Sequence, residues 1–157
     1  MPTTRSMADP RLDLNLQFAV KKSERPRRSD FRRWAKAALM TDAVVALRVV
    51  DEAEGRALNR DYRGKDYATN VLTFAYGSSA NGEPLSGDIV VCAPVVAREA
   101  AEQGIALEAH YAHLTLHGML HLQGYDHETE AEAVTMESIE SFIMRRLGYP
   151  DPYAADS

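Results

Sequence analysis

All five histidines of this 157-residue chain lie in one segment, EAHYAHLTLHGMLHLQGYDH, which spans residues 108–127. His117 and His121 are four residues apart, so a helix would place both imidazoles on one face, about 6 Å apart along its axis. Gly124 is suited to end that helix in a left-handed turn, after which the chain can return and bring His127 to the same place. Three imidazoles so arranged can hold one zinc ion, whose bonds to nitrogen are about 2.0–2.1 Å long.

The spacing His-x3-His-x2-Gly-x2-His matches the long zinc signature of the metzincin peptidases at every position but one. Gly118 stands where those enzymes carry the glutamate that takes a proton from the metal-bound water. Glycine has no acid–base group, so the spacing favours a metal site but not peptidase activity. Three neutral ligands leave one position on zinc open, where it can polarise a phosphoryl oxygen or a water molecule. The alternative is that these are unrelated histidines on an ordinary helix.

Other polar residues around this segment are expected to have different roles. His113 lies about 12 Å from His121 along a helix, too far to share a metal with it, and is expected to support a ligand from behind or to pack. His110 is expected to be exposed, and Asp126 to orient a ligand imidazole. Cys92, within a valine-rich run, is predicted to be a buried core thiol and not a ligand or nucleophile.

The elements that position the histidines can be predicted from the periodicity of apolar residues. Alternating and valine-rich runs predict strands over residues 12–18, 43–50, 70–76 and 87–93. Helices are predicted over 31–40, capped by Ser29 or Asp30, and over 51–63, 93–104, 107–124 and 130–147. Strands alternating with helices, followed by helices alone, favour an α+β or three-layer arrangement with one sheet. We expect one domain over residues 1–157, with loose ends at 1–11 and 154–157.

The composition excludes several classes of protein. The chain is 45% hydrophobic and 26% charged, which excludes a disordered tail protein, a collagen-like repeat and a coiled coil. Its single cysteine allows no intramolecular disulfide. We find no apolar run long enough for a signal peptide or a membrane helix. The chain is therefore expected to be a cytoplasmic domain with no membrane contact.

The charge is distributed unevenly along the chain. Residues 1–98 hold 16 Lys and Arg against 12 Asp and Glu, whereas residues 99–157 hold 2 against 11. Seven basic residues lie in KKSERPRRSDFRR, residues 21–33. Such a segment can bind a polyanion although the net charge is −5, or it can be an ordinary solvated surface.

Several motifs in this chain resemble the YbeY family of bacterial rRNA maturation endoribonucleases. They are HGMLHLQGYDH, LNRDYRGKDYATNVLTFAY, SGDIVVC and the closing LGYPDPY, and the likeness covers roughly residues 12–153. The resemblance implies a mixed, mainly four-stranded sheet beside a helical layer, in which the metal-bearing helix is similar to the zincin core. It implies one catalytic metal, zinc, on His117, His121 and His127, and a functional arginine at Arg63. Family members often have proline where this chain has Ala68 and Ala75, which affects loop rigidity and not the site.

The resemblance also implies a function. The family has been linked to 16S rRNA 3′-end maturation, to ribosome quality control and to contacts with small-subunit ribosomal proteins. We therefore expect a metal-dependent endoribonuclease acting on single-stranded RNA, including precursor rRNA, and not on DNA. Arg63 is assigned to the phosphate in the transition state and Lys65 to a neighbouring phosphate. The nucleophile is either water or the substrate's own 2′-hydroxyl.

Two other functions are compatible with the same three histidines. A metallopeptidase or amidase would need a carboxylate base from elsewhere, and Asp126 and Glu128 are the acids that lie close in sequence. A ribosome-assembly factor without enzymatic activity would use the metal structurally, although three ligands without a fourth argue for an open site. Imidazole also suits nickel, copper and iron, so the metal is zinc by expectation only.

Overall fold

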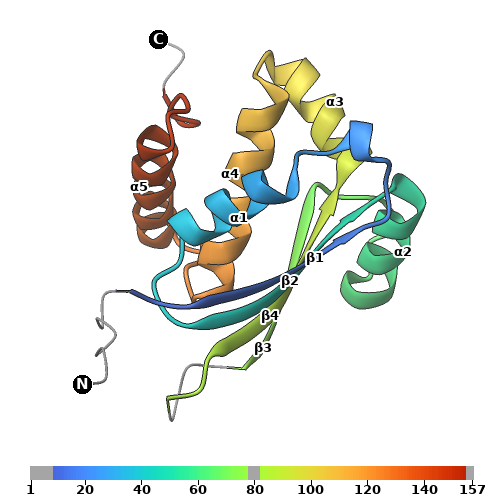
Figure 1. The fold of residues 1–157 in the computed structure, drawn as a ribbon. Coiled ribbons are helices and arrows are strands. Elements are labelled where there is room, and N and C mark those ends of the chain that lie inside the picture. Colours follow the sequence, from blue (N-terminus) through green and yellow to red (C-terminus); the bar gives the residue numbers. More distant parts are fainter. Residues whose placement is uncertain (1–8, 78–81, 155–157) are drawn as a thin grey trace.

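A four-stranded sheet in the order β1-β2-β4-β3 forms the centre of the fold (Figure 1). The structure is a computed structural model and describes residues 9–77 and 82–154. The strands are β1 (Leu12–Phe18), β2 (Ala43–Val50), β3 (Val71–Gly77) and β4 (Leu85–Cys92). The helices are α1 (Arg28–Ala37), α2 (Glu52–Arg63), α3 (Ala93–Gln103), α4 (Leu107–Leu122) and α5 (Glu130–Arg146). A short 3-10 helix, Lys22–Glu24, precedes α1.

The sheet is mixed, as predicted. β1 pairs with β2 and β2 with β4 in parallel, whereas β3 runs antiparallel to β4 along the edge of the sheet. The parallel pair β1 and β2 requires a crossover connection, which α1 supplies. The α+β class is therefore confirmed.

The two faces of the sheet bury two hydrophobic clusters because successive strand residues point to opposite sides. Val49 and Val91 belong to the larger cluster, which includes side chains of α1, α4 and α5. Val50 and Cys92, each one position further along, belong to the smaller cluster, against which Leu58 of α2 packs. Cys92 is buried, as predicted, and burial raises the pKa of its thiol.

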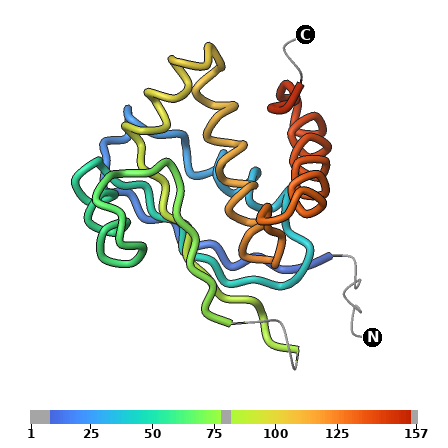
Figure 2. The backbone as a smooth tube through the Cα atoms, turned by 180° about the vertical axis from the view of Figure 1, so that it is seen from behind, coloured from blue at the N-terminus to red at the C-terminus, as the bar shows by residue number. Residues whose placement is uncertain are grey.

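Helix α4 is the most buried of the helices. It packs against α1, α3 and α5 and against strands β3 and β4. Figure 2 shows the same arrangement from behind, with α4 running alongside α5. Tyr111 of α4 meets Phe31 of α1 edge-on, with ring centroids 6.0 Å apart. A helix held on so many sides is a rigid support for the histidines that it carries.

The strand predictions were accurate for β1 and β2, whereas the start of α1 was predicted wrongly. Arg27, and not Ser29 or Asp30, caps this helix. Asp30 lies three residues inside, where its carboxylate accepts a hydrogen bond from the backbone N–H of Arg27 at 3.2 Å. An acid at this position reaches back to the first residue of the helix and is favoured by the helix dipole. The helix also ends at Ala37, three residues before the predicted end, and the N–H of Met40 donates to the Gln123 side chain at 2.6 Å.

The predicted ends of the domain fall mostly outside the described residues, as do residues 78–81 between β3 and β4. Arg11 is described: its N–H donates to the Asp42 carboxylate at 2.8 Å and its carbonyl accepts from Ala43. Among the described residues, no helix is both long and apolar enough to cross a membrane.

Candidate metal centre

His117, His121 and His127 converge on one point beside the end of α4. One ligand nitrogen from each lies within 4.8 Å of the other two. The ring centroids are 4.6 Å apart for His117 and His121, 5.1 Å for His121 and His127, and 5.7 Å for His117 and His127. The three imidazoles therefore lie together, as the spacing of the histidines predicts.

The turn after α4 brings the third histidine back. Gly124 has φ +100°, a left-handed conformation that favours glycine. The N–H of Gly124 donates to the carbonyl of His121 at 3.0 Å, and that of Tyr125 to Leu120 at 3.1 Å. These two bonds form the motif that commonly closes a helix at a glycine. Beyond the turn, the backbone N–H of His127 donates to the side chain of Asp126 at 2.7 Å.

Asp126 contacts the backbone of His127 more closely than its ring. Its carboxylate is 4.0 Å from His127 Nδ1, beyond hydrogen-bond distance. The structure therefore does not confirm the prediction that Asp126 orients a ligand imidazole, because its carboxylate binds the backbone N–H of His127 and not the ring.

A buried carboxylate from α5 lies behind the histidines. Glu140 accepts hydrogen bonds from His117 Nδ1 at 3.1 Å and from His113 Nε2 at 2.7 Å. Burial alone would raise its pKa, but the hydrogen bonds from His113 and His117 prevail and lower the pKa to about 2. With Nδ1 of His117 held in this way, its Nε2 is the nitrogen left for a metal. His113 stands behind a ligand, as expected.

The structure contradicts the prediction that His110 is exposed. Only 5% of this residue is accessible, because α3 packs against α4 at this point. His110 Nε2 lies 2.9 Å from the carboxylate of Glu99. The same carboxylate accepts a hydrogen bond from Asn70 Nδ2 at 3.0 Å, which ties α3 to the start of β3.

Glu140 was not among the site residues predicted from the sequence. It lies 13 residues beyond the last histidine, within a helix whose other buried residues include Met136, Ile143 and Met144. A single acid on an otherwise apolar helix face was the signal available in the sequence, since acids are rarely buried without a partner.

A cavity of about 530 Å³ opens in front of the three imidazoles. Its walls also include Arg63, in the last turn of α2, and Lys65, which follows the left-handed Gly64. Arg63 Nη2 donates a hydrogen bond to the carbonyl of Thr73 in β3. The structure therefore brings all five predicted site residues to one cavity. None of the lining residues comes from the basic segment 21–33.

The chemistry of the three histidines fits a metal ion. Burial lowers the pKa of His121, with smaller contributions from His117 and His127, and so favours the neutral form that binds metals. Within the described part of the chain, neither ring nitrogen of His121 forms a hydrogen bond. Three neutral nitrogens leave a fourth position for water or substrate, as in catalytic zinc sites.

Gly118 has a structural role that explains the absence of a glutamate. A Cβ at this position would lie 3.1 Å from Cγ2 and 3.2 Å from Cδ1 of Ile89 in β4. Helix α4 therefore rests directly on the sheet here, and any side chain at position 118 would crowd Ile89.

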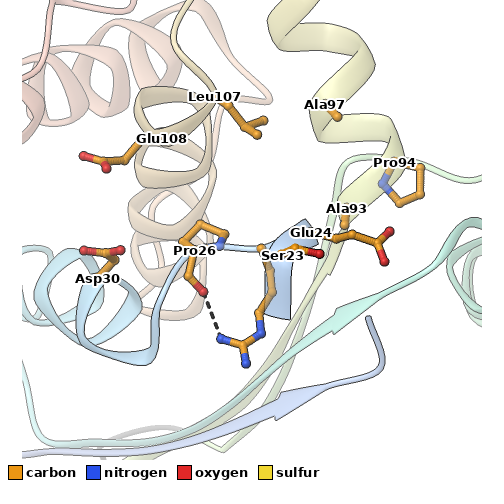
Figure 3. A pocket seen from close by; sticks show the side chains of 10 residues that line it. Ser23, Glu24, Pro26, Asp30, Ala93, Pro94, Ala97, Leu107 and Glu108 are labelled. Atoms are coloured by element: carbon orange, nitrogen blue, oxygen red, sulfur yellow. Dashed lines mark hydrogen bonds between the residues drawn. The ribbon is translucent and has the colours of Figure 1, made fainter. Parts of the chain in front are cut away.

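A second cavity, of about 520 Å³, lies between the segment before α1 and the starts of α3 and α4 (Figure 3). Its walls include the carboxylates of Glu24, Asp30 and Glu108, together with apolar side chains such as Ala93 and Leu107. Asp30 is bound by Arg27, and Glu108 accepts a hydrogen bond from Tyr149 at 2.6 Å. This cavity is lined by no histidine and has two of its three acids already partnered.

Two relatives with similar sequences carry the same name as the family whose model matches this chain. The family model described as Endoribonuclease YbeY matches residues 17–148. Endoribonuclease YbeY from Methylobacillus flagellatus is 63% identical over 148 residues, which are 94% of this chain and 97% of that one. The protein of the same name from Azoarcus sp. is 60% identical over 153 residues, covering 92% of this chain and 61% of that longer one. The solution structure of TM1509 from Thermotoga maritima has a related fold, with a TM-score of 0.52 and 24% identity over 90% of this chain and 99% of that one. This chain belongs to the YbeY family of endoribonucleases.

Proposed function

We propose that this protein is a zinc-dependent endoribonuclease that hydrolyses phosphodiester bonds of single-stranded RNA. The observation that carries the proposal is a single cavity lined by three converging imidazoles, Arg63 and Lys65. Cleavage of a phosphodiester needs positive groups near its negatively charged non-bridging oxygens, and this cavity has residues suited to supply them. Membership of an endoribonuclease family supports RNA as the substrate.

The zinc ion would be held by His117, His121 and His127. When bound, it would supply a positive charge that polarises a phosphoryl oxygen or a water molecule. Glu140 fixes the ring of His117 from behind and so sets the direction in which Nε2 points.

Arg63 is suited to bind the reacting phosphate. Its guanidinium carbon lies 5.0 Å from the centre of the Phe74 ring, and only Nη2 donates a hydrogen bond to the described residues. The other guanidinium N–H groups are free to pair with phosphate oxygens, which a planar guanidinium does with two bonds. Lys65 is exposed on the same wall and would bind a neighbouring phosphate as a point charge.

The cellular role that we propose is maturation of the 3′ end of 16S rRNA and quality control of ribosomes in the cytoplasm. The motifs shared with the family support this role, because they extend over most of the chain. Precursor rRNA would be the substrate, and proteins of the small ribosomal subunit would be partners. The structure favours neither rival function. A peptidase is not favoured because Gly118 faces Ile89 and has no acid–base group. A structural metal is not favoured because the cluster able to hold a metal has three side chains among the described residues, which leaves one position open.

One experiment tests the proposal against both rivals. Zinc-loaded protein is incubated with a single-stranded RNA, the same RNA as a duplex, and a denatured protein. We expect cleavage of the single strand alone, and loss of that cleavage in folded His117→Ala that still binds RNA. Cleavage of the protein would support a peptidase, and loss of folding together with RNA binding would support a structural metal. A 2′,3′-cyclic phosphate on the product would identify the 2′-hydroxyl as the nucleophile.

A further inference from the structure

The segment that follows α5 folds back onto that helix. The N–H of Tyr149 donates to the carbonyl of Met144 at 2.9 Å, which closes the end of α5. The carboxylate of Asp151 then accepts two hydrogen bonds, from Ser141 Oγ at 2.6 Å and from the N–H of Tyr153 at 2.9 Å. Residues 149–153 are therefore attached to α5 at both ends, and the position of Tyr153 is fixed.

The hydroxyl of Tyr153 reaches the carboxylate behind the metal centre. It donates a hydrogen bond to Glu140 Oε1 at 2.8 Å. The residue as a whole is 40% exposed, whereas the Glu140 side chain is only 1% exposed. The Tyr153 ring also meets the His113 ring edge-on, with centroids 5.4 Å apart.

The hydrogen bonds of Glu140 divide between its two oxygens. Oε1 receives the closest bonds from His113 Nε2, at 2.7 Å, and from the Tyr153 hydroxyl, at 2.8 Å. Oε2 is the nearer oxygen to His117 Nδ1, at 3.1 Å against 3.3 Å for Oε1. Two donors on one oxygen thus set the rotation of the carboxylate, and that rotation presents the other oxygen to His117.

We propose that Tyr153 is a positioning residue for the metal centre, acting through Glu140 on His117. By holding Oε1, its hydroxyl keeps Oε2 against His117 Nδ1 and so keeps His117 Nε2 directed at the metal. Without it, the buried carboxylate is held by imidazoles alone and can rotate between them. The carboxyl-terminal segment thereby becomes part of the metal site. This inference rests on the proposed metal binding and not on the proposed substrate.

Tyr149 offers a matched control in the same segment. Its hydroxyl is also hydrogen-bonded, with Trp34 Nε1 at 3.0 Å, Arg33 Nη2 at 3.0 Å and Glu108 at 2.6 Å. None of these partners touches the histidine cavity. Tyr149→Phe therefore removes one hydrogen-bonded tyrosine hydroxyl from the same segment without affecting Glu140.

The test measures zinc affinity by competition with a chelator, without RNA. We expect Tyr153→Phe to weaken zinc binding about 10-fold and Glu140→Gln up to about 100-fold, the range found when a partner of a ligand is removed. Tyr149→Phe should bind zinc as the wild type does, even if its free energy of unfolding falls as much as that of Tyr153→Phe. Imidazole ¹⁵N shifts of the metal-free proteins should show the Nδ1–H form of His117 less populated in Tyr153→Phe alone.

Two outcomes would overturn the inference: unchanged zinc affinity in Tyr153→Phe, or an equal loss in both tyrosine variants. Either leaves the proposed function intact, provided that the zinc-loaded wild type cleaves RNA. Conversely, a wild type that binds zinc but cleaves no RNA would refute the proposed function and leave the role of Tyr153 standing.

Discussion

Two cavities of this protein differ in chemistry and hardly at all in size. The histidine cavity measures about 530 Å³ and the cavity between the starts of α1, α3 and α4 about 520 Å³. In the second, Asp30 and Glu108 already have partners in the fold. In the first, His121 has no hydrogen-bond partner among the described residues and Arg63 has free donors. The second cavity also holds a buried polar atom without a partner among the described residues, Arg25 Nε. The convergence of three imidazoles with Arg63 and Lys65, and not volume, therefore distinguishes the histidine cavity.

The largest contrast is expected between one substitution in each cavity. His121→Ala removes one of three ligands and should abolish both zinc binding and RNA cleavage. Glu108→Gln changes a charged wall of the other cavity and should leave both unchanged. Metal content after dialysis and an RNA cleavage assay measure the two effects. Full activity in His121→Ala, or its loss in Glu108→Gln, would break the distinction between the cavities.

The next effect tests the charge that the histidine cavity directs at a phosphate. Arg63→Gln should lower kcat about 10²–10³-fold, the loss that follows removal of one donor to a transition-state oxyanion. Zinc affinity should not change, because Arg63 is not among the three ligands. Arg60→Gln, one turn earlier on α2 and outside the cavity lining, is the control. Equal losses of kcat in the two variants would remove the catalytic assignment of Arg63.

A smaller effect distinguishes the cavity from the basic segment at residues 21–33. The logarithm of the RNA affinity falls linearly with the logarithm of the salt concentration. Lys65→Gln should make this slope shallower by about 0.7, the value for one phosphate on a single strand. In the basic segment, Arg27 binds Asp30, and Arg28 donates to the carbonyl of Leu16 at 3.4 Å. If that segment nevertheless binds the RNA, replacing Arg27 and Arg28 by Glu will further reduce the dependence of RNA affinity on salt concentration. Measuring RNA affinity at several salt concentrations distinguishes the two cases.

The smallest effect concerns stability and belongs to the second cavity. Asp30→Ala removes the carboxylate that accepts the hydrogen bond from the Arg27 N–H in the first turn of α1. It should lower the free energy of unfolding by about 1 kcal/mol at pH 7, as loss of a capping interaction does. Burial raises the pKa of Asp30, but the hydrogen bonds and charge of Arg27 outweigh it and lower the pKa in the folded state. This contribution is therefore complete above the unfolded pKa of about 4 and is lost as the pH falls through the lower folded value. Urea denaturation should show the two proteins converging in acid, with equal RNA cleavage at neutral pH.

Much of the fold and of the site could be predicted because the relevant signals are local. β1 alternates apolar and polar residues and β2 is rich in valine, and the limits of both strands were predicted correctly. The spacing from His117 to His127 is set by one helix and one glycine turn, so it could be interpreted from the sequence. Arg63 and Lys65 were found through the family resemblance, since the approach of α2 to α4 is a tertiary contact.

The errors arose where distant elements meet. Glu140 and Tyr153 reach the histidines from α5 and from the segment after it, and nothing in their immediate sequence specifies that contact. His110 was expected to be exposed, but α3 packs over it and supplies Glu99 as its partner. Asp30 was placed at the wrong position because an acid three residues inside a helix and an acid at its cap give the same local pattern.

The bond between Arg63 and Thr73 has a consequence for self-association. β3 lies on the edge of the sheet, and such edges can recruit a strand from another molecule through their unpaired backbone groups. The guanidinium occupies the Thr73 carbonyl and places a positive charge on that edge, while a register shift between Ala75 and Gly77 makes the strand irregular. The residue assigned to the substrate's phosphate thus also occupies one backbone acceptor on this edge, so substitutions at Arg63 should be checked for solubility on storage.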